Sequence, residues 1–312
     1  MSTIVEVKDL VKKFDDLIAV DHVSFGIETG EVFGLLGPNG AGKTTTISMI
    51  SCLIDPTGGE VVVDGNSTRS KPTAVKATLG VVPQDVALYP TLSAAENLAF
   101  WARMYGLSGT DLKQAVHDAL ELAGLEERAK ERIEKYSGGM KRRINIAAGI
   151  LHRPKVLLMD EPTVGIDPQS RNHILETVKD LNASGMTVLY TSHYMEEVEY
   201  LCSRIAIMDH GKIIAMGTLN ELRDIVGSMD VIDIKVEDVS DGVLERGRAI
   251  PGVEKADRVE EGIKVFTASS GKVLGQMIAV LESEGSHVTS VSVTEPDLES
   301  VFLHLTGKSL RD

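Results

Sequence analysis

A glycine-rich octapeptide near the N-terminus has the composition and spacing of a phosphate-binding loop. Residues 37–44 read GPNGAGKT, which matches the pattern G-x-x-x-x-G-K-[ST]. Glycines let the main chain wrap closely around an anion with its N–H groups pointing inward, and the start of a helix adds the positive end of a dipole. Lys43 is expected to reach the β- and γ-phosphates, and the Thr44 hydroxyl to ligate Mg²⁺. The loop predicts nucleotide binding but leaves kinases, GTPases and motor ATPases open.

Two consecutive carboxylates at the end of an apolar run supply the second half of such a site. Residues 156–159 are Val-Leu-Leu-Met, and Asp160 and Glu161 follow them. A buried strand would deliver both side chains at its carboxyl end, where open α/β sheets bind ligands. Asp160 is then placed to hold the Mg²⁺ shell, and Glu161 to polarise an attacking water. Without the phosphate loop, the pair could also be a solvated turn at the end of a strand.

The elements that must position these groups alternate between strand and helix patterns. A helix is expected from about Lys43 to Leu53, and the pattern is helical again from about 87 to 150. Ser93 with Glu96 resembles a capping box, and Gly124 closes a second helix of that region. The alternation predicts an α/β fold with a mixed, mainly parallel sheet and helices on both faces. Strands are expected at residues 4–7, 20–27, 32–36, 61–63, 156–159, 188–190 and 205–208.

The character of the sequence changes after about residue 221. Strand patterns occur at 231–236, 263–267 and 287–293, and helical stripes run through 273–281 and 298–305. This arrangement predicts a small α/β accessory domain, with a ferredoxin-like fold as one possibility. We expect a first domain, which carries the phosphate loop, at 1–225, with a helical subdomain at about 86–150, and the accessory domain at 226–312.

Composition narrows the classes of function. The chain has 312 residues, of which 43% are apolar and 25% charged, and a net charge of −14. No window approaches the ~20 consecutive apolar residues that cross a bilayer, and the N-terminus carries charges where a signal peptide needs its apolar region. We therefore expect a cytoplasmic protein. Nucleic-acid binders need basic surfaces, so the acidic balance argues against that role.

The order of several motifs along residues 1–220 resembles the nucleotide-binding subunit of ABC transporters. Residues 37–44 resemble the Walker A loop, 156–160 the Walker B strand, and 137–139 (Ser-Gly-Gly) the signature motif. Gln84 resembles the Q-loop glutamine, and His193 the switch histidine. A Ser-Gly-Gly loop alone is a weak signal; its position about twenty residues before the acidic strand gives it weight.

Three further parts of the sequence also resemble the family, and two of them depart from its usual motif. Residues 165–168, which contain Asp167, resemble the D-loop. Tyr136 and Met140 flank the signature core where the common motif has leucine and glutamine. Phe14 resembles the aromatic residue that stacks on adenine, although Asp15 follows it instead of the usual glycine, and a core-strand phenylalanine is the alternative.

The resemblance implies ATP and Mg²⁺ as ligands, and a head-to-tail dimer in which each ATP lies between the Walker A loop of one copy and the signature motif of the other. It assigns hydrolysis to Glu161, His193, Gln84 and Lys43, and the metal to Thr44, Gln84 and Asp160. The implied nucleotide contacts are Phe14, Gly37, Pro38, Asn39, Gly40, Ala41, Gly42, Lys43, Thr44, Thr45, Tyr136, Ser137, Gly138, Gly139 and Asp167.

The resemblance also implies partners and a direction of transport. Residues 137–143, 192–197 and 295–302 are similar to the type-2 export branch, whose members carry a comparable C-terminal extension. The expected assembly is a homodimer, or a pair with another ATPase subunit, held on the cytosolic face of the membrane by an integral-membrane permease. The cargo is left open among drugs, ions, lipids and polysaccharides. The alternatives are an importer subunit, a soluble ABC ATPase of translation or DNA repair, and a P-loop kinase or GTPase.

Overall fold

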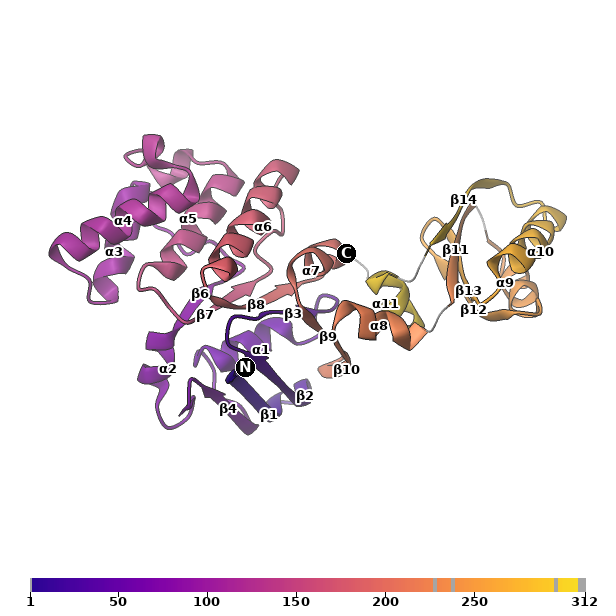
Figure 1. Cartoon of the computed structure of the whole chain (residues 1–312), viewed down its shortest axis with the longest axis horizontal. Coiled ribbons are helices and arrows are strands. Elements are labelled where there is room, and N and C mark those ends of the chain that lie inside the picture. Colours follow the sequence, from indigo (N-terminus) through magenta and orange to yellow (C-terminus); the bar gives the residue numbers. More distant parts are fainter. Residues whose placement is uncertain (1, 227–228, 237–238, 295–296, 308–312) are drawn as a thin grey trace. The chain divides into compact units, whose positions relative to one another are not determined.

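The computed structural model describes residues 2–226, 229–236, 239–294 and 297–307. The chain divides into two compact units, Met1–Ala215 and Met216–Asp312 (Figure 1). Residues 216–225, which the sequence assigns to the first domain, fall in the second unit, where α8 (Leu219–Val226) packs against α11 (Leu298–Thr306).

A six-stranded sheet forms the centre of the first unit, in the order β10-β9-β3-β8-β7-β6. β3 pairs in parallel with β8 and β9, and β7 pairs in parallel with β6 and β8. Every residue of β3, β7 and β8 is buried, which explains the apolar run that each of these strands contains. The bounds are β3 Val32–Leu36, β6 Leu79–Val82, β7 Val156–Asp160, β8 Thr187–Ser192, β9 Arg204–Asp209 and β10 Lys212–Gly217.

Different helices cover the two faces of this sheet because successive side chains of a strand point to opposite sides. Leu158 of β7 packs in one cluster with Ile47 of α1 (Lys43–Ile50). Its neighbour Leu157 packs in a second cluster with Ile174 of α6 (Pro168–Ala183). α7 (Met195–Leu201) also lies against the second face. Helices on both faces confirm the predicted α/β class.

A second, antiparallel sheet in the order β2-β1-β4-β5 packs on the α1 side. The sequence predicts short strands here, and that prediction was wrong: β1 (Thr3–Phe14) and β2 (Leu17–Glu28) each have 12 residues. Four register shifts interrupt their pairing, and these irregularities break the alternating apolar pattern by which a long strand is recognised. The remaining elements are β4 Gly58–Val63, β5 Asn66–Ser67 and α2 Pro72–Thr78.

The helical region contains α3 (Ala94–Met104), α4 (Gly109–Ala123) and α5 (Gly138–Ile150), with 3₁₀ turns at Glu126–Arg128 and Ile133–Lys135. The capping box is confirmed, because the Ser93 hydroxyl accepts from the Glu96 N–H while the Glu96 carboxylate accepts from the Ser93 N–H at 2.8 Å. Gly124 ends α4 with φ of 58°, as predicted.

The second unit contains the order β-α-β-β-α-β in a sheet arranged β12-β13-β11-β14. All its described strand pairs are antiparallel. This topology is ferredoxin-like and confirms that expectation. β12 and α9 were not anticipated. The bounds are β11 Asp230–Val236, α9 Asp241–Arg248, β12 Val253–Val259, β13 Gly262–Thr267, α10 Ser270–Ser283 and β14 Val288–Thr294.

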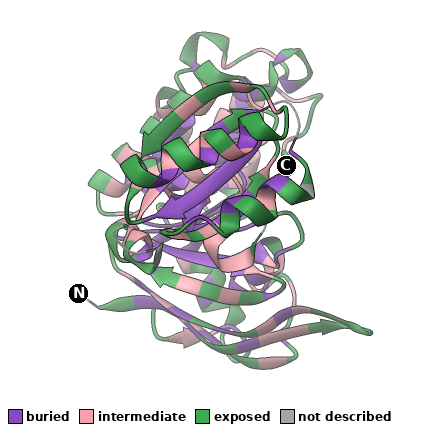
Figure 2. Cartoon of the chain, turned by 90° about the vertical axis from the view of Figure 1, so that its right-hand side faces the viewer, coloured by how far each residue is buried: buried purple, intermediate pink, exposed green. Residues whose placement is uncertain are grey.

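The central strands β3, β7 and β8 are buried throughout, whereas many residues of the helices are exposed (Figure 2). Across the residues that the structure describes, none of the helices combines the length and the apolar character that a membrane span requires.

Candidate functional site

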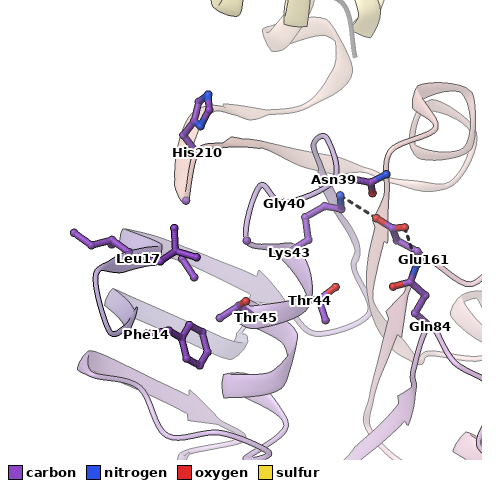
Figure 3. A pocket seen from close by; sticks show the side chains of 14 residues that line it. Phe14, Leu17, Asn39, Gly40, Lys43, Thr44, Thr45, Gln84, Glu161 and His210 are labelled. Carbon is purple, nitrogen blue, oxygen red and sulfur yellow. Dashed lines mark hydrogen bonds and ion pairs between the residues drawn. The ribbon is translucent and has the colours of Figure 1, made fainter. Parts of the chain in front are cut away.

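A cavity of about 450 Å³ lies at the carboxyl end of β3, where the phosphate loop begins (Figure 3). Its volume is within the range of about 300–1,000 Å³ usual for small-molecule sites. The loop between β3 and α1 forms one wall, and β1, β2 and the carboxyl end of β7 supply others. The lining residues are Phe14, Leu17, Ile18, Ala19, Asn39, Gly40, Gly42, Lys43, Thr44, Thr45, Gln84, Glu161, His210 and Gly211.

The tight course of the phosphate loop requires glycine at two of its positions. Gly42, immediately before α1, has φ of 104°, and a Cβ there would lie 2.5 Å from the Ala19 carbonyl oxygen. A Cβ on Gly37 would lie 2.2 Å from the carbonyl oxygen of Met208. The main chain of β2 and β9 therefore packs directly against the loop, and a side chain at either glycine position would clash with it and distort the loop.

Lys43 is buried and its ammonium group has three partners. It donates to the main-chain oxygens of Gly37 at 2.6 Å and Pro38 at 3.0 Å. It also lies 2.9 Å from Oε1 of Glu161 (Figure 3). Both side chains are nearly inaccessible, with 3% and 5% exposed. The loop thus folds back over its own lysine, and the ammonium group is held beside the carboxylate that follows β7.

The Glu161 carboxylate lies next to three other predicted site residues, namely Lys43, Gln84 and His193. Its Oε2 atom lies 3.4 Å from the Gln84 amide nitrogen and 3.3 Å from Nδ1 of His193. Its φ is 43°, an uncommon value for a residue with a side chain, and its N–H donates to the Thr191 hydroxyl at 3.0 Å. Backbone held in such a region is common at active sites. The carboxylate can accept a proton from a water molecule in the cavity while the amide and imidazole fix its orientation.

The residues predicted to hold a metal are also adjacent. The Asp160 carboxylate accepts from the hydroxyls of Thr44 and Thr191, the latter at 2.8 Å. Burial raises the pKa of this carboxyl group, and the hydrogen bonds partly oppose that rise. A hydroxyl, a carboxylate and the nearby Gln84 amide form an oxygen donor set that suits Mg²⁺. Among the described residues there is no group of three or more His, Cys, Asp or Glu side chains able to hold a metal.

The structure does not bring the signature motif into this cavity. Ser137 begins α5 as its N-cap and accepts from the Met140 N–H. A Cβ on Gly139 would lie 2.0 Å from Oγ of Ser170 and 3.2 Å from the Asp167 carboxylate, so the motif contacts the first turn of α6. Asp167 caps that helix by accepting from the Ser170 N–H at 2.9 Å, which lowers the pKa of its carboxyl group.

The two aromatic residues predicted to contact the nucleotide, Phe14 and Tyr136, differ in their exposure to solvent. Phe14 is 44% exposed at the end of β1, lines the cavity and carries Lys12 over its ring at 4.8 Å, so it is not a core-strand residue. The Tyr136 side chain is 4% exposed within the core of the helical region, and its hydroxyl donates to the Arg128 carbonyl oxygen at 2.7 Å. The phenylalanine is available to a ligand, whereas the tyrosine side chain supports the packing below the signature motif.

Sequence reasoning missed several residues of the site. Arg142 of α5 is buried and donates to the main-chain oxygens of Pro83, at 2.7 Å, and Gln84, which fixes the segment that carries the Gln84 side chain. In the sequence, the only indication of this role of Arg142 is that it is a basic residue on the helix that follows the signature motif. Thr191 was missed because its hydroxyl acts through long-range contacts. Leu17, Ile18, Ala19, His210 and Gly211 line the cavity without any local motif.

Comparisons with known proteins agree with this geometry. The sequence profile described as "ABC transporter" matches residues 20–164. The chain is 48% identical to the linearmycin resistance ATP-binding protein LnrL of Bacillus subtilis (strain 168), over 98% of this chain and 99% of that protein. It is 36% identical to the Nod factor export ATP-binding protein I of Cupriavidus metallidurans over the full length of both. The daunorubicin resistance ATP-binding protein DrrA2 of Streptomyces coeruleorubidus is 34% identical over 97% of this chain and 95% of its own length.

Solved structures show the same fold. An ATP-binding subunit of an ABC transporter superposes with a TM-score of 0.66 at 31% identity, covering 72% of this chain and 94% of that one. A dimeric ATP-binding cassette in a post-hydrolysis state, bound to ADP and Pi, has a TM-score of 0.64 at 29% identity and covers 69% of this chain and 98% of that one.

Proposed function

This chain belongs to the ABC transporter family as an ATP-binding subunit with ATPase activity in an export system, and we propose that two copies of it enclose ATP between them to drive a separate integral-membrane permease. Similarity over the full length to export and resistance subunits disfavours the importer, translation and repair alternatives.

The separation of the phosphate loop from the signature motif carries the proposal of a dimer. Lys43, Glu161 and Gln84 meet in one cavity, whereas Ser137 and Gly139 line no part of it, and Gly139 lies against the first turn of α6. Each copy therefore holds a phosphate-binding half-site and a glycine-lined helix start that its own cavity does not use. A head-to-tail arrangement brings the two together, and the negative charge of ATP then holds the copies in place.

Hydrolysis in this arrangement uses the groups around Glu161. The carboxylate takes a proton from water as the water oxygen bonds to the γ-phosphorus, and the bond to the bridging oxygen breaks to release ADP and phosphate. Lys43 and the loop N–H groups stabilise the growing negative charge, while His193 and Gln84 orient the base and the water. Mg²⁺, held by Thr44, Asp160 and Gln84, neutralises phosphate charge when bound.

The location follows from the same proposal. The ATPase binds the cytosolic face of the cell membrane through its permease, which contains the cargo pathway. Because the relatives include export and resistance subunits, we propose outward transport. The homodimer is proposed for the isolated chain, and a second ATPase subunit could replace one copy in the complete transporter.

The test is a variant that binds ATP without hydrolysing it. Glu161→Gln removes the base but keeps the size of the side chain, so we expect turnover to fall by a factor of about 10² or more. ATP binding should persist, and light scattering after size exclusion at saturating ATP should show a stable dimer. A monomer under these conditions would contradict the enclosed-nucleotide proposal.

A second variant separates the two half-sites. Ser137→Arg, added to Glu161→Gln, places a bulky cation in the signature loop, which does not line the cavity. The double variant should retain ATP, measured by equilibrium dialysis, yet remain monomeric. Dimerisation of the double variant to the same extent would remove the signature loop from the interface.

A further inference from the structure

Glu197 of α7 is a buried carboxylate, 2% exposed, that the sequence does not single out. Its Oε2 atom accepts hydrogen bonds from three hydroxyl groups: Thr163 at 2.8 Å, Tyr190 at 2.9 Å and Ser192 at 3.0 Å. Burial, together with the charge of Glu197, raises the pKa of the Tyr190 hydroxyl well above its usual value, which keeps that group a donor. A buried carboxylate with so many partners is costly to replace and fixes the geometry around it.

Two of these partners adjoin the proposed hydrolytic groups. Thr163 lies two residues after Glu161, in the turn that leaves β7, and Ser192 immediately precedes His193 at the end of β8. Glu197 therefore connects the segments that deliver the base and the imidazole, and those two side chains are 3.3 Å apart.

The Ser192 contacts show how the connection would position the imidazole. Its hydroxyl proton is donated to Glu197, so the oxygen lone pairs are directed elsewhere, and one accepts from the Tyr194 N–H at 2.9 Å. Its carbonyl oxygen accepts from the N–H of Gly37, the first residue of the phosphate loop, at 3.3 Å. The main chain on both sides of His193 is thereby attached to fixed groups.

A second route reaches the same carboxylate from α6. Arg171 lies one turn after Asp167, the N-cap of that helix, and its Nε is 3.4 Å from Oε1 of Glu197. The same guanidinium lies over the ring of Tyr194 at 4.6 Å, and that ring packs against His193 with centroids 4.2 Å apart. The start of α6, next to the signature motif, is thus connected through packed side chains to the imidazole.

We propose that Glu197 is a positioning residue for ATP hydrolysis, which holds His193 against Glu161 and couples both to the first turn of α6. This inference rests on the proposed function, in which Glu161 acts as the base and His193 orients it. Glu197 is not one of the residues that line the cavity, so we assign its effect to the groups that it holds.

Glu197→Gln tests the proposal because the amide has the same size but places an NH₂ donor where an oxygen accepted. Either the hydroxyl cluster or Arg171 then faces a second donor. We expect kcat to fall between about 10-fold and 100-fold, the scale of a small misplacement of catalytic groups. The affinity for ATP, measured by equilibrium binding, should stay within about threefold because Lys43 and the phosphate loop are unchanged. Glu196→Gln, the same charge change on the exposed neighbouring residue, should leave both values unchanged.

A double-mutant cycle with His193→Ala separates positioning from general destabilisation. If Glu197 acts through the imidazole, the Gln substitution adds little further loss in the His193→Ala background. Equal, multiplicative losses in both backgrounds would overturn the proposal. Should Glu197→Gln fail to fold, Ser192→Ala, which removes one hydroxyl of the cluster, replaces it in the same cycle with the same expectation.

The outcomes also distinguish this inference from the function on which it rests. Unchanged turnover in His193→Ala would refute the role of the imidazole and with it the inference. Loss of turnover in His193→Ala, with full activity in Glu197→Gln, would leave the proposed function standing and reject the positioning role alone.

Discussion

Lys43 and Glu161 form a buried ion pair at the centre of the proposed site, with Nζ and Oε1 2.9 Å apart. Transferring two charged groups from water to the protein interior costs free energy. Buried charged pairs are therefore frequent at functional sites, where each charge also interacts with a ligand or another functional group. Here the ammonium group faces the phosphate loop and the carboxylate faces the imidazole of His193. The pair holds the phosphate-binding cation and the proposed base within reach of one ligand.

Lys43→Ala should weaken ATP binding at least tenfold, since one charge-assisted contact contributes roughly 1.5–3 kcal/mol. It should also lower stability by up to about 3–5 kcal/mol because Glu161 loses its cation. Equilibrium binding and chemical denaturation measure the two effects.

The double variant Lys43→Ala with Glu161→Gln removes the uncompensated charge and should recover most of the stability without recovering affinity. Tight ATP binding by either variant would refute the phosphate role of the lysine.

At the scale of elements, the important contact is that between the starts of α5 and α6. Gly139 of α5 lies so close to Ser170 of α6 that no side chain fits between them. Gly138, one residue earlier, has no atom nearer to an added Cβ than Ile166, at 3.9 Å. The two glycines of the signature motif therefore have different structural duties: one permits a close helix contact, and the other faces open space.

Gly139→Ala should destabilise the protein by about 1–3 kcal/mol, the usual cost of overpacking. Gly138→Ala, the matched control, should change stability by less than about 0.5 kcal/mol. Thermal unfolding of the two variants without nucleotide makes the comparison independent of any dimer. Equal stability of both would show that α6 can move away from the signature motif at no cost.

At the scale of the whole molecule, the proposed reaction needs groups from two copies. Lys43, Thr44, Gln84 and Glu161 line the cavity, while the signature motif lies outside it. An isolated chain then has only half of the donors that neutralise the triphosphate.

The specific ATPase activity of the purified chain should therefore fall on dilution, in proportion to protein concentration once the dimer dissociates. The expected result is a rate that depends on the square of protein concentration at the low end, measured by phosphate release at saturating ATP. A specific activity that is constant under extreme dilution would contradict the shared site.

The sequence by itself determined the local features of this protein. The spacing of residues 37–44 specified the phosphate loop, and the apolar run before Asp160 specified a buried strand that ends in carboxylates. Gly124 and the Ser93–Glu96 pair marked helix ends correctly. These signals are readable because each depends on residues within a few positions of one another.

Only the tertiary structure decided which distant residues meet. Three contacts join separate elements in this way. They are the hydrogen bonds of Glu197 with its hydroxyl partners, those of Arg142 with the main chain at Pro83 and Gln84, and the close approach of Gly139 to α6. The lengths of β1 and β2 belong with them, since bulges disturb the alternation of apolar residues. The periodicity of a sequence indicates which residues lie on the same face of a helix or strand. It does not indicate which other element packs against that face, because this depends on contacts between distant parts of the chain. The site therefore could be named from its motifs, but its supporting contacts could not.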